Sequence, residues 1–558
     1  MASIRLGGDS AVLSLGGVDL HASIVEPAGA EFSQQAVDLQ PPQRPSPGLR
    51  KLMVELSGPN HAGSARIVVM LALDAASAAP GLQALQRWNA SGPFSRAKSD
   101  DLGVNACPPG HRVLWNGICQ PLSPWPPNRP LTRAVVHPAY LTTAKPRVIN
   151  VSVGRQLFVD SFLVQRSDNI RTVFHSPQYA ANNPVVKSSE PWEVGETAGG
   201  LAGTAKPVGV WWAPSKNHFE MFYRCGSNSL CVAYSQDSVS WTKPKIDNGF
   251  KACGGAPCNM VLDVGGIGNS AVWLDLETTN TSRRYVLAAS HTSIELYTSA
   301  TGTSFTHEAT SSRVEDCTSI YKDLFRNKWV YSIKASGPKA SPGRTRRYWE
   351  GDDVLADCHW GSIDGPAPVK PGDPVQWMGS DSLDDPNLAC GYTPSLDSNN
   401  TQLYQFDGVS YESLVIGLFS IITGKRCSPP RPFKRGGEQD AVYVGWSRDG
   451  FTFQRSPIRA SAFLPMGQEF HSWNMQNVRS SAGGFLTSSD QLRFFVEGKS
   501  GSCAGIPGCK PALGAVDGNT STGTATMRRE MSMHPRFDRA CVSLTRYASA
   551  FQAMALHP

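Results

Sequence analysis

The chain has 558 residues, of which 40% are hydrophobic and 18% charged, and it contains 52 glycines and 41 prolines. This composition is typical of a globular protein built from short strands and turns, and the length allows several domains. The net charge of +6, spread over 52 basic and 46 acidic residues, is too dilute to indicate a nucleic-acid-binding protein. No apolar run in the sequence reaches the roughly eighteen residues that a membrane span requires.

The beginning of the chain does not look like a signal peptide, because its first seventeen residues lack a continuous apolar core. The segment 66–81 has a positive residue, seven apolar residues and then a small-residue stretch, which is the order of a signal sequence. Translation from an internal methionine such as Met53 would place this segment near the amino terminus. The alternative is a short buried strand or helix.

The composition changes near residue 150. Residues 1–149 form a Pro-rich and Ala-rich extension in which "PPQRPSPG" and "SPWPPNRP" have the character of semi-rigid linkers. Between these two stretches, Cys107 and Cys119 are spaced to close a small loop. We expect little other packed structure in this extension.

Thirteen cysteines include four pairs that a disulfide could close into short loops. The pairs are Cys107 with Cys119, Cys225 with Cys231, Cys253 with Cys258, and Cys503 with Cys509. None has the spacing of a zinc site, so we expect structural disulfides, an oxidising compartment, and neither a metal nor a cofactor. Five glycosylation sequons fit a secreted glycoprotein, at Asn89, Asn150, Asn280, Asn399 and Asn519.

From residue 150 to 548, short segments rich in aromatic and β-branched residues alternate with Gly, Asn, Asp and Pro. Examples are "HFEMFYRC", "LCVAYSQ", "KWVYSIK" and "AVYVGWSR". No amphipathic helix of useful length separates them, which predicts an all-β architecture of hairpins. Residues 549–558 are left as a short tail.

One turn recurs three times with an aromatic residue six positions after a serine: "SQDSVSW" at 235–241, "SATGTSF" at 299–305 and "SRDGFTF" at 447–453. Asp and Gly suit such a hairpin turn, because the carboxylate can accept backbone N–H groups and glycine adopts positive φ. The aromatic ring would pack back over the hairpin. A degenerate fourth copy ends at Trp360. Recurrence of one hairpin predicts a β-propeller, most simply of five blades, with a β-sandwich as the alternative.

The chain here resembles a known family. The series "RQLFVDSFLVQRSDNIRTVFHSPQYAANNPVV", "PWE", "FEMFYRC", "AYSQDSVSWTKP", "GWSRDGFTFQR" and "ATMRRE" is similar to five-bladed propellers of the glycoside hydrolase family 32 and 43 type, the invertase and arabinanase type. This resemblance implies a secreted glycoside hydrolase that acts on a polysaccharide or oligosaccharide. Sialidase turns place seven residues between serine and aromatic, whereas the offset here is six, which favours the five-bladed group.

Glycoside cleavage usually requires two carboxyl groups across the bond, and a third often tunes the acid. In a propeller, the innermost strand of each blade lines the central tunnel, so candidate residues should lie there. The segments that we expect to form these strands are "GTAKPVGVWW", "LDVGGIGNSAVWL", "VEDCTSIYKD", "LYQFDGVSYESLVIGLF" and "HSWNMQNVRS".

Glu412 is our first candidate for the general acid, because it is a lone carboxylate beside Tyr411 and before an apolar strand. Asp316 and Asp407 are candidates for the base and the tuning carboxylate, and Asp160 is a further candidate. For each of these carboxylates the alternative is a structural role in capping or turning the backbone.

Substrate binding is expected from His471, Trp473 and Tyr411, through hydroxyl contacts and stacking on a sugar ring, with simple packing as the alternative. The chain departs from family 32 in lacking the WMNDPNG, R-D-P and E-C motifs. Its first inner strand also has no carboxylate where family 43 would place the base. The competing hypotheses are therefore a non-catalytic carbohydrate-binding or extracellular interaction propeller, and a sialidase-like enzyme with an arginine cluster.

Overall fold

The structure is a computed structural model. It describes residues 3–15, 18–26, 31–36, 50–55, 68–72, 107–128, 132–151, 153–168, 174–197, 200–226, 229–264, 267–336, 343–364, 370–384, 401–423, 439–457, 459, 462–467, 472–487, 491–500, 520–528 and 541–544.

The chain divides into two compact units, residues 1–104 and 105–558. The described part of the first unit forms two antiparallel sheets, ordered β1-β2-β3-β6 and β4-β5. Their strands are β1 (Ser3–Gly7), β2 (Ser10–Leu15), β3 (Val18–Glu26), β4 (Glu31–Ala36), β5 (Arg50–Glu55) and β6 (Val68–Ala72). Within the segment 66–81, residues 68–72 are thus a strand paired with β3, and the rest lies outside the described residues.

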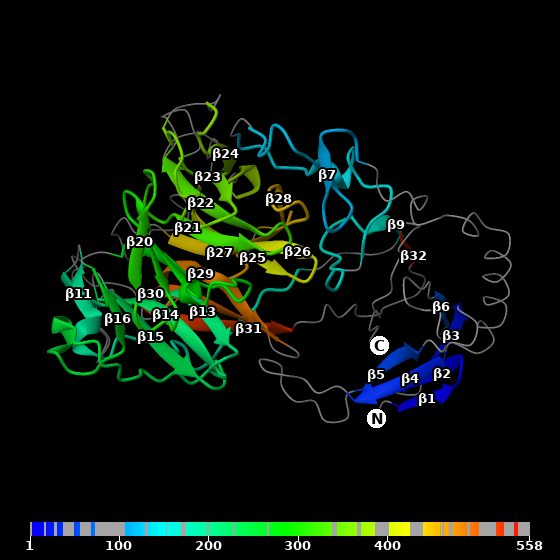
Figure 1. The fold of residues 1–558 in the computed structure, drawn as a ribbon, viewed down its shortest axis with the longest axis horizontal. Helices are drawn as coiled ribbons and strands as arrows, with labels where there is room; N and C mark the ends of the chain where they lie inside the picture. Colours follow the sequence, from blue (N-terminus) through cyan, green and yellow to red (C-terminus); the bar gives the residue numbers. More distant parts are fainter. Residues whose placement is uncertain are drawn as a thin grey trace, which may run out of the picture. The chain divides into compact units, whose positions relative to one another are not determined.

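The second unit contains five four-stranded sheets within its described residues (Figure 1). In order from inner to outer strand, they are β13 (Ala205–Ala213), β14 (His218–Cys225), β15 (Ser229–Ser235) and β16 (Met260–Asp263); β17 (Asn269–Leu274), β18 (Tyr285–Ser290), β19 (Ile294–Ser299) and β20 (Thr306–Thr310); β21 (Ser319–Asp323), β22 (Lys328–Ser336), β23 (Arg344–Gly351) and β24 (Val375–Met378); β25 (Gln402–Tyr411), β26 (Leu414–Thr423), β27 (Gln439–Ser447) and β28 (Phe453–Arg455); and β29 (Gln476–Thr487), β30 (Gln491–Lys499), β31 (Thr520–Arg528) and β10 (Gln178–Tyr179).

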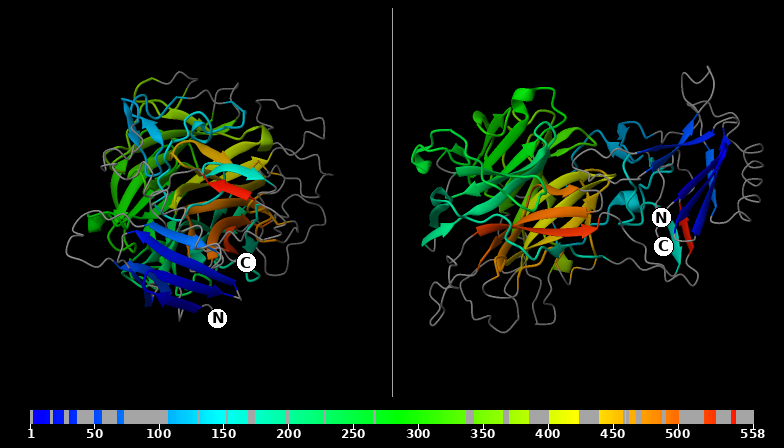
Figure 2. Two further views of the ribbon diagram at one scale, coloured as in Figure 1. Left: turned by 90° about the vertical axis from the view of Figure 1, so that its right-hand side faces the viewer. Right: turned by 90° about the horizontal axis from the view of Figure 1, so that it is seen from below.

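The five sheets form a closed ring. Their first strands contact one another in the order β13, β17, β21, β25, β29, and β29 contacts β13 again. Figure 2 shows the orange and red strands of the fifth blade beside the teal strands of the first. The prediction of an all-β, five-bladed propeller is confirmed, each segment expected to hold an inner strand does so, and the sandwich alternative is excluded.

The smaller elements of the second unit cover the ends of the blades. They are the strand pairs β7 (His111–Val113) with β8 (Cys119–Pro121), β9 (Val164–Asp168) with β32 (Cys541–Leu544) and β11 (Val194–Thr197) with β12 (Gly200–Gly203), and the 3₁₀ turns η2 (Ala139–Leu141), η3 (Pro191–Glu193), η4 (Lys251–Cys253), η5 (Thr281–Arg283) and η6 (Ser382–Asp384). In the described part of the chain, no helix has the length and apolar character needed to cross a membrane.

The recurring turns join the third and fourth strands of their blades. In the fourth blade, the Asp449 Oδ1 accepts the backbone N–H groups of Phe451 at 2.9 Å and Thr452 at 2.6 Å. The aromatic residue that follows, Phe453, is buried against the rings of Phe406 and Phe419 in the same blade. The turn therefore satisfies its own amides while the ring fixes it to the sheet.

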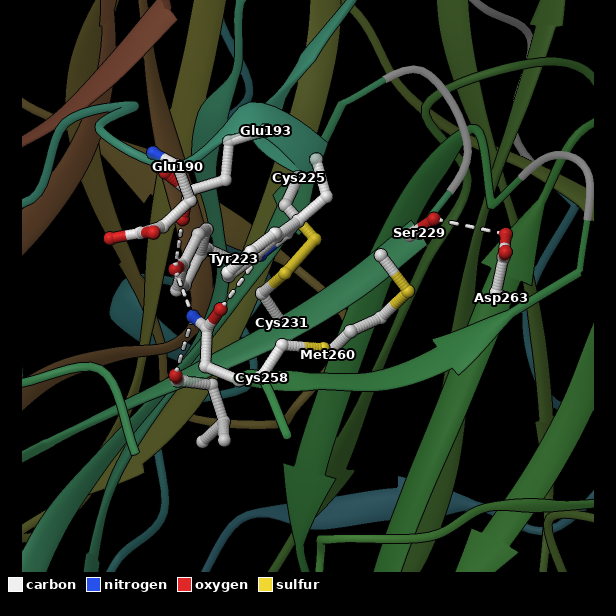
Figure 3. The surroundings of a disulfide bond; sticks show 12 residues. Glu190, Glu193, Tyr223, Cys225, Ser229, Cys231, Cys258, Met260 and Asp263 are labelled. Carbon is white, nitrogen blue, oxygen red and sulfur yellow. Dashed lines mark hydrogen bonds between the residues drawn. A yellow bond between two sulfur atoms is a disulfide. The ribbon is translucent and has the colours of Figure 1, made fainter. Parts of the chain in front are cut away.

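Three of the four predicted disulfides are present: Cys107–Cys119, Cys225–Cys231 and Cys253–Cys258. Cys503 and Cys509 lie outside the described residues. Figure 3 shows the Cys225–Cys231 bridge between β14 and β15, with the Tyr223 hydroxyl directed at Glu193. That hydroxyl donates to the buried Glu193 carboxylate at 2.6 Å, so the surroundings of this bridge are tightly packed. These disulfides indicate folding in a non-cytoplasmic, oxidising compartment.

Residues 107–149 pack against the propeller, which differs from the expectation of little packed structure there. Trp115 stacks on Phe325 with 4.4 Å between ring centroids, and its indole N–H donates to the Ser413 carbonyl at 3.0 Å. Tyr140 is buried and donates to the Thr452 carbonyl at 3.1 Å. Aromatic residues within the Pro-rich stretch supply the apolar surface for this docking. The division between the units accordingly falls at 104/105, before the composition change at residue 150.

Replacing Asp449 by alanine should lower the free energy of unfolding by about 1–2 kcal/mol, because two turn amides lose their acceptor. Urea denaturation of the variant and the parent measures this difference. As a control, Asp364→Ala removes an exposed carboxylate paired only with the exposed Arg313, and should change stability by less than about 1 kcal/mol. Equal effects of the two substitutions would contradict the role assigned to the turn.

Candidate active site

The inner strands run in the same direction around the ring, so their first residues lie together at one end, which we call the entry pole. There the Lys206 ammonium of β13 donates to Asn269 of β17 at 2.6 Å. At the other end, the far pole, the backbone N–H of Leu324 donates to the Ser410 hydroxyl at 3.0 Å. The entry pole is where polar and charged side chains of all five blades converge.

Asp316 immediately precedes β21 and has the most exposed carboxylate of this group, with 49% of its side chain accessible. It forms an ion pair with Lys334 of β22 and accepts the Tyr404 hydroxyl at 2.9 Å. Partial burial raises the pKa of the Asp316 carboxyl, but the Lys334 and Tyr404 interactions outweigh it and leave that pKa below its usual value. Asp316 is therefore ionised at neutral pH.

Asp407 lies on the neighbouring inner strand, β25, and only 3% of it is exposed. The register of β25 shifts between Leu403 and Gln405, and beyond this bulge Gln405 and Asp407 share one face of the strand. The Asp407 carboxylate accepts Gln405 Nε2 at 2.8 Å and the Ser480 hydroxyl at 2.6 Å. Burial raises the pKa of Asp407 above its usual value despite these two hydrogen bonds.

A buried charge network connects the fifth blade with the first. Lys206 lies 2.9 Å from the Glu497 carboxylate of β30, and Arg479 of β29 pairs with Asp440 at 2.5 Å. The Arg479 guanidinium also lies 4.2 Å from the centre of the Tyr404 ring. Burial raises the pKa of Glu497, but the charges of Lys206 and Arg479 outweigh it and keep that pKa low. The network holds the two ends of the ring together at the entry pole.

Glu412 lies at the far pole, in the turn between β25 and β26, where it adopts φ 54°. Its carboxylate accepts the backbone N–H of Arg155 at 2.8 Å and pairs with the Arg155 guanidinium at 3.0 Å. Tyr411 accepts the same guanidinium at 3.1 Å. Eight residues of extended strand, about 26 Å, separate Glu412 from the Tyr404 that contacts Asp316. The structure therefore does not bring Glu412 and Asp316 within the roughly 10 Å that a catalytic pair requires.

Asp160 has a structural environment. It is fully buried and receives two hydrogen bonds from the Arg448 guanidinium, at 2.8 and 2.9 Å, and one from the Trp446 indole at 3.1 Å. These contacts fix the segment before β9 to the fourth blade. Trp473 is half-buried over Gly498 and Gly523, which leave room for its ring. His471 lies outside the described residues.

Sequence reasoning overlooked Lys206, Tyr404, Arg479 and Glu497. Lys206 and Arg479 were visible as charges within expected inner strands, but those strands were searched for carboxylates. Among the described residues, no group of three or more His, Cys, Asp or Glu side chains is arranged to hold a metal ion. The charged side chains of the entry pole instead balance one another.

The sequence matches no family profile and no curated protein. Similar solved structures include a protein from work on GH130 mannoside phosphorylases and hydrolases that target β-1,2 mannosidic linkages in Candida mannan, at 11% identity and TM-score 0.38, covering 65% of this chain and 96% of that one. The catalytic domain of a Coprinopsis cinerea GH62 α-L-arabinofuranosidase has 10% identity, TM-score 0.36 and coverage of 63% and 98%. A Schwanniomyces occidentalis fructofuranosidase has 12%, 0.37, and 67% and 64%.

Asp407→Asn should change how stability depends on pH. Because the folded-state pKa of Asp407 is raised, the native protein holds a proton that the unfolded chain releases above about pH 4. Wild-type stability should therefore fall as pH rises from there towards the folded-state pKa, and the asparagine variant should lack this loss. Denaturation curves at several pH values measure it. The control is Asp364→Asn, at an exposed carboxylate, and parallel curves for wild type and Asp407→Asn would contradict the assignment.

Glu412→Gln should lower the free energy of unfolding by at most about 1 kcal/mol, because its partner Arg155 is 41% exposed and solvent screens the pair. Carbohydrate binding should not change, since Glu412 lies at the far pole. Thermal denaturation and a binding titration measure the two quantities. A loss of binding with unchanged stability would show that Glu412 belongs to the site after all.

Proposed function

We propose that this chain is a secreted glycoside hydrolase-like protein that binds a polysaccharide or oligosaccharide at the entry pole. One observation carries the proposal. Two carboxyl groups, Asp316 and Asp407, lie on adjacent inner strands, and their surroundings shift their pKa values in opposite directions. Such a divergence is how one site holds a proton donor beside an ionised carboxylate at the same pH.

In this proposal Asp407 is the general acid, because burial keeps it protonated, and it donates its proton to the leaving oxygen of the glycosidic bond. Asp316 is the ionised partner, acting either on the sugar directly or through a water molecule, according to its distance from Asp407 in the complex. Lys334 and Tyr404 hold the Asp316 carboxylate in place. Activity should then fall at low pH as Asp316 is protonated and at high pH as Asp407 loses its proton.

Secretion is supported by the disulfides and by one sequon in particular. Asn280 is exposed at the amino-terminal end of η5, in the loop between β17 and β18. A glycan attached there would extend into solvent without disturbing a blade. We propose that this asparagine is glycosylated.

A second candidate function, binding of carbohydrate without cleavage, is favoured by the 3% exposure of Asp407. Cleavage requires Gln405 and Ser480 to move aside so that the acid reaches the substrate. The sialidase-like alternative has less support, because two of the arginines near the pole are already occupied. Arg346 donates to the carbonyls of Cys317 and Tyr404, and Arg479 pairs with Asp440.

Release of reducing sugar from a panel of polysaccharides tests the proposal. Asp407→Asn and Asp316→Asn should each reduce the rate about a hundredfold or more, because each removes one partner in proton transfer or charge stabilisation. Glu412→Gln is the matched control and should retain the rate. Binding without cleavage by the wild-type protein would favour the second candidate, and cleavage that survives both aspartate substitutions would overturn the assignment of roles.

A further inference from the structure

Arg224 and Lys206 are directly opposite each other in the antiparallel pair β13 and β14, at the entry pole. Residues in that relation point to the same face of the sheet, with Cβ atoms about 5 Å apart. Two like charges placed in this way are destabilising unless each finds a counter-charge. Lys206 has one, the Glu497 carboxylate at 2.9 Å.

Arg224 has no such counter-charge. None of the described residues forms an ion pair with its guanidinium, and its Nε is shielded from solvent without a hydrogen-bond partner. Burial lowers the pKa of Arg224, and the nearby Glu497 compensates only in part. A cation that is partly removed from water and left unpaired is costly, so its presence calls for a ligand that completes it.

The surrounding charges point the same way. Cationic side chains outnumber carboxyl groups around the Tyr404 ring and the Cys317 turn in the described structure, and one of the carboxyl groups, Asp407, has a raised pKa. The cations are Lys206, Arg224, Lys334, Arg344, Arg346 and Arg479, and the carboxyl groups are Asp316, Asp407, Asp440 and Glu497. The entry pole therefore carries an excess of positive charge.

We infer that the entry pole takes an acidic saccharide, one that carries a carboxylate or sulfate group, and that Arg224 pairs with this group. The planar guanidinium offers parallel N–H donors that match two oxygens of either anion. This inference rests on the proposed function, because it names the class of saccharide that the same site accepts. Arg224 is a binding residue in this scheme and takes no part in proton transfer.

A glycan array holding neutral, uronate-bearing and sulfated oligosaccharides tests the inference on the full chain, followed by calorimetric titration of the acidic glycans that bind. The wild-type protein should prefer acidic glycans. Arg224→Gln should weaken their binding roughly tenfold to a hundredfold and leave neutral glycans unaffected, whereas Arg224→Lys should retain part of the affinity. Arg283→Gln, which removes an exposed arginine between β17 and β18 at the far pole, is the matched control and should behave as wild type.

The wild-type protein alone gives a second readout should Arg224→Gln fail to fold. Raising the salt concentration should weaken binding of acidic glycans and not of neutral ones. Absence of an acidic preference, or a preference that Arg224→Gln retains, would overturn the inference. So would Arg224-dependent binding of inorganic phosphate with no preference among the glycans. Arg224-dependent binding of acidic glycans without cleavage would refute hydrolysis while supporting this inference, and cleavage of neutral glycans alone would do the reverse.

Discussion

The pairing of β10 with β31 is the constraint on which the ring depends. Gln178 and Tyr179, which precede the first blade, pair with Thr526 and Ala525 at the end of the last one. This contact completes the fifth sheet with a strand from the other end of the propeller. Because the ring is closed, no inner strand is left as an open edge, and the five strand starts are held at one place. The convergence of charges at the entry pole follows from that closure.

The fold could be predicted from sequence because its signals are local. A serine turn with an aromatic six residues later, such as 447–453, specifies a hairpin within a few residues, and short cysteine spacings specify their own loops. The docking of residues 107–149 was not visible in this way. It depends on Trp115 meeting Phe325, two hundred residues away in sequence.

The candidate site could be predicted only in part, for the same physical reason. Asp316 and Asp407 were found because they lie on inner strands, but their opposite pKa shifts come from Lys334, Ser480 and burial, which are tertiary effects. Glu412 looked equally suitable in sequence. What decides between them is which end of a strand each residue occupies, and strand direction around the axis is known only once the ring is built.

The segment before the propeller joins two blades. Trp115 contacts Phe325 of the third blade and Ser413 of the fourth, while the Asp160 carboxylate is bonded to Arg448 of the fourth. A truncated protein that begins at the change in composition, near residue 150, would keep Asp160 but lose Trp115. It would expose the Phe325 ring to water and leave an apolar surface across the boundary between two blades, where self-association begins. Shortened versions for crystallisation should therefore start before Cys107.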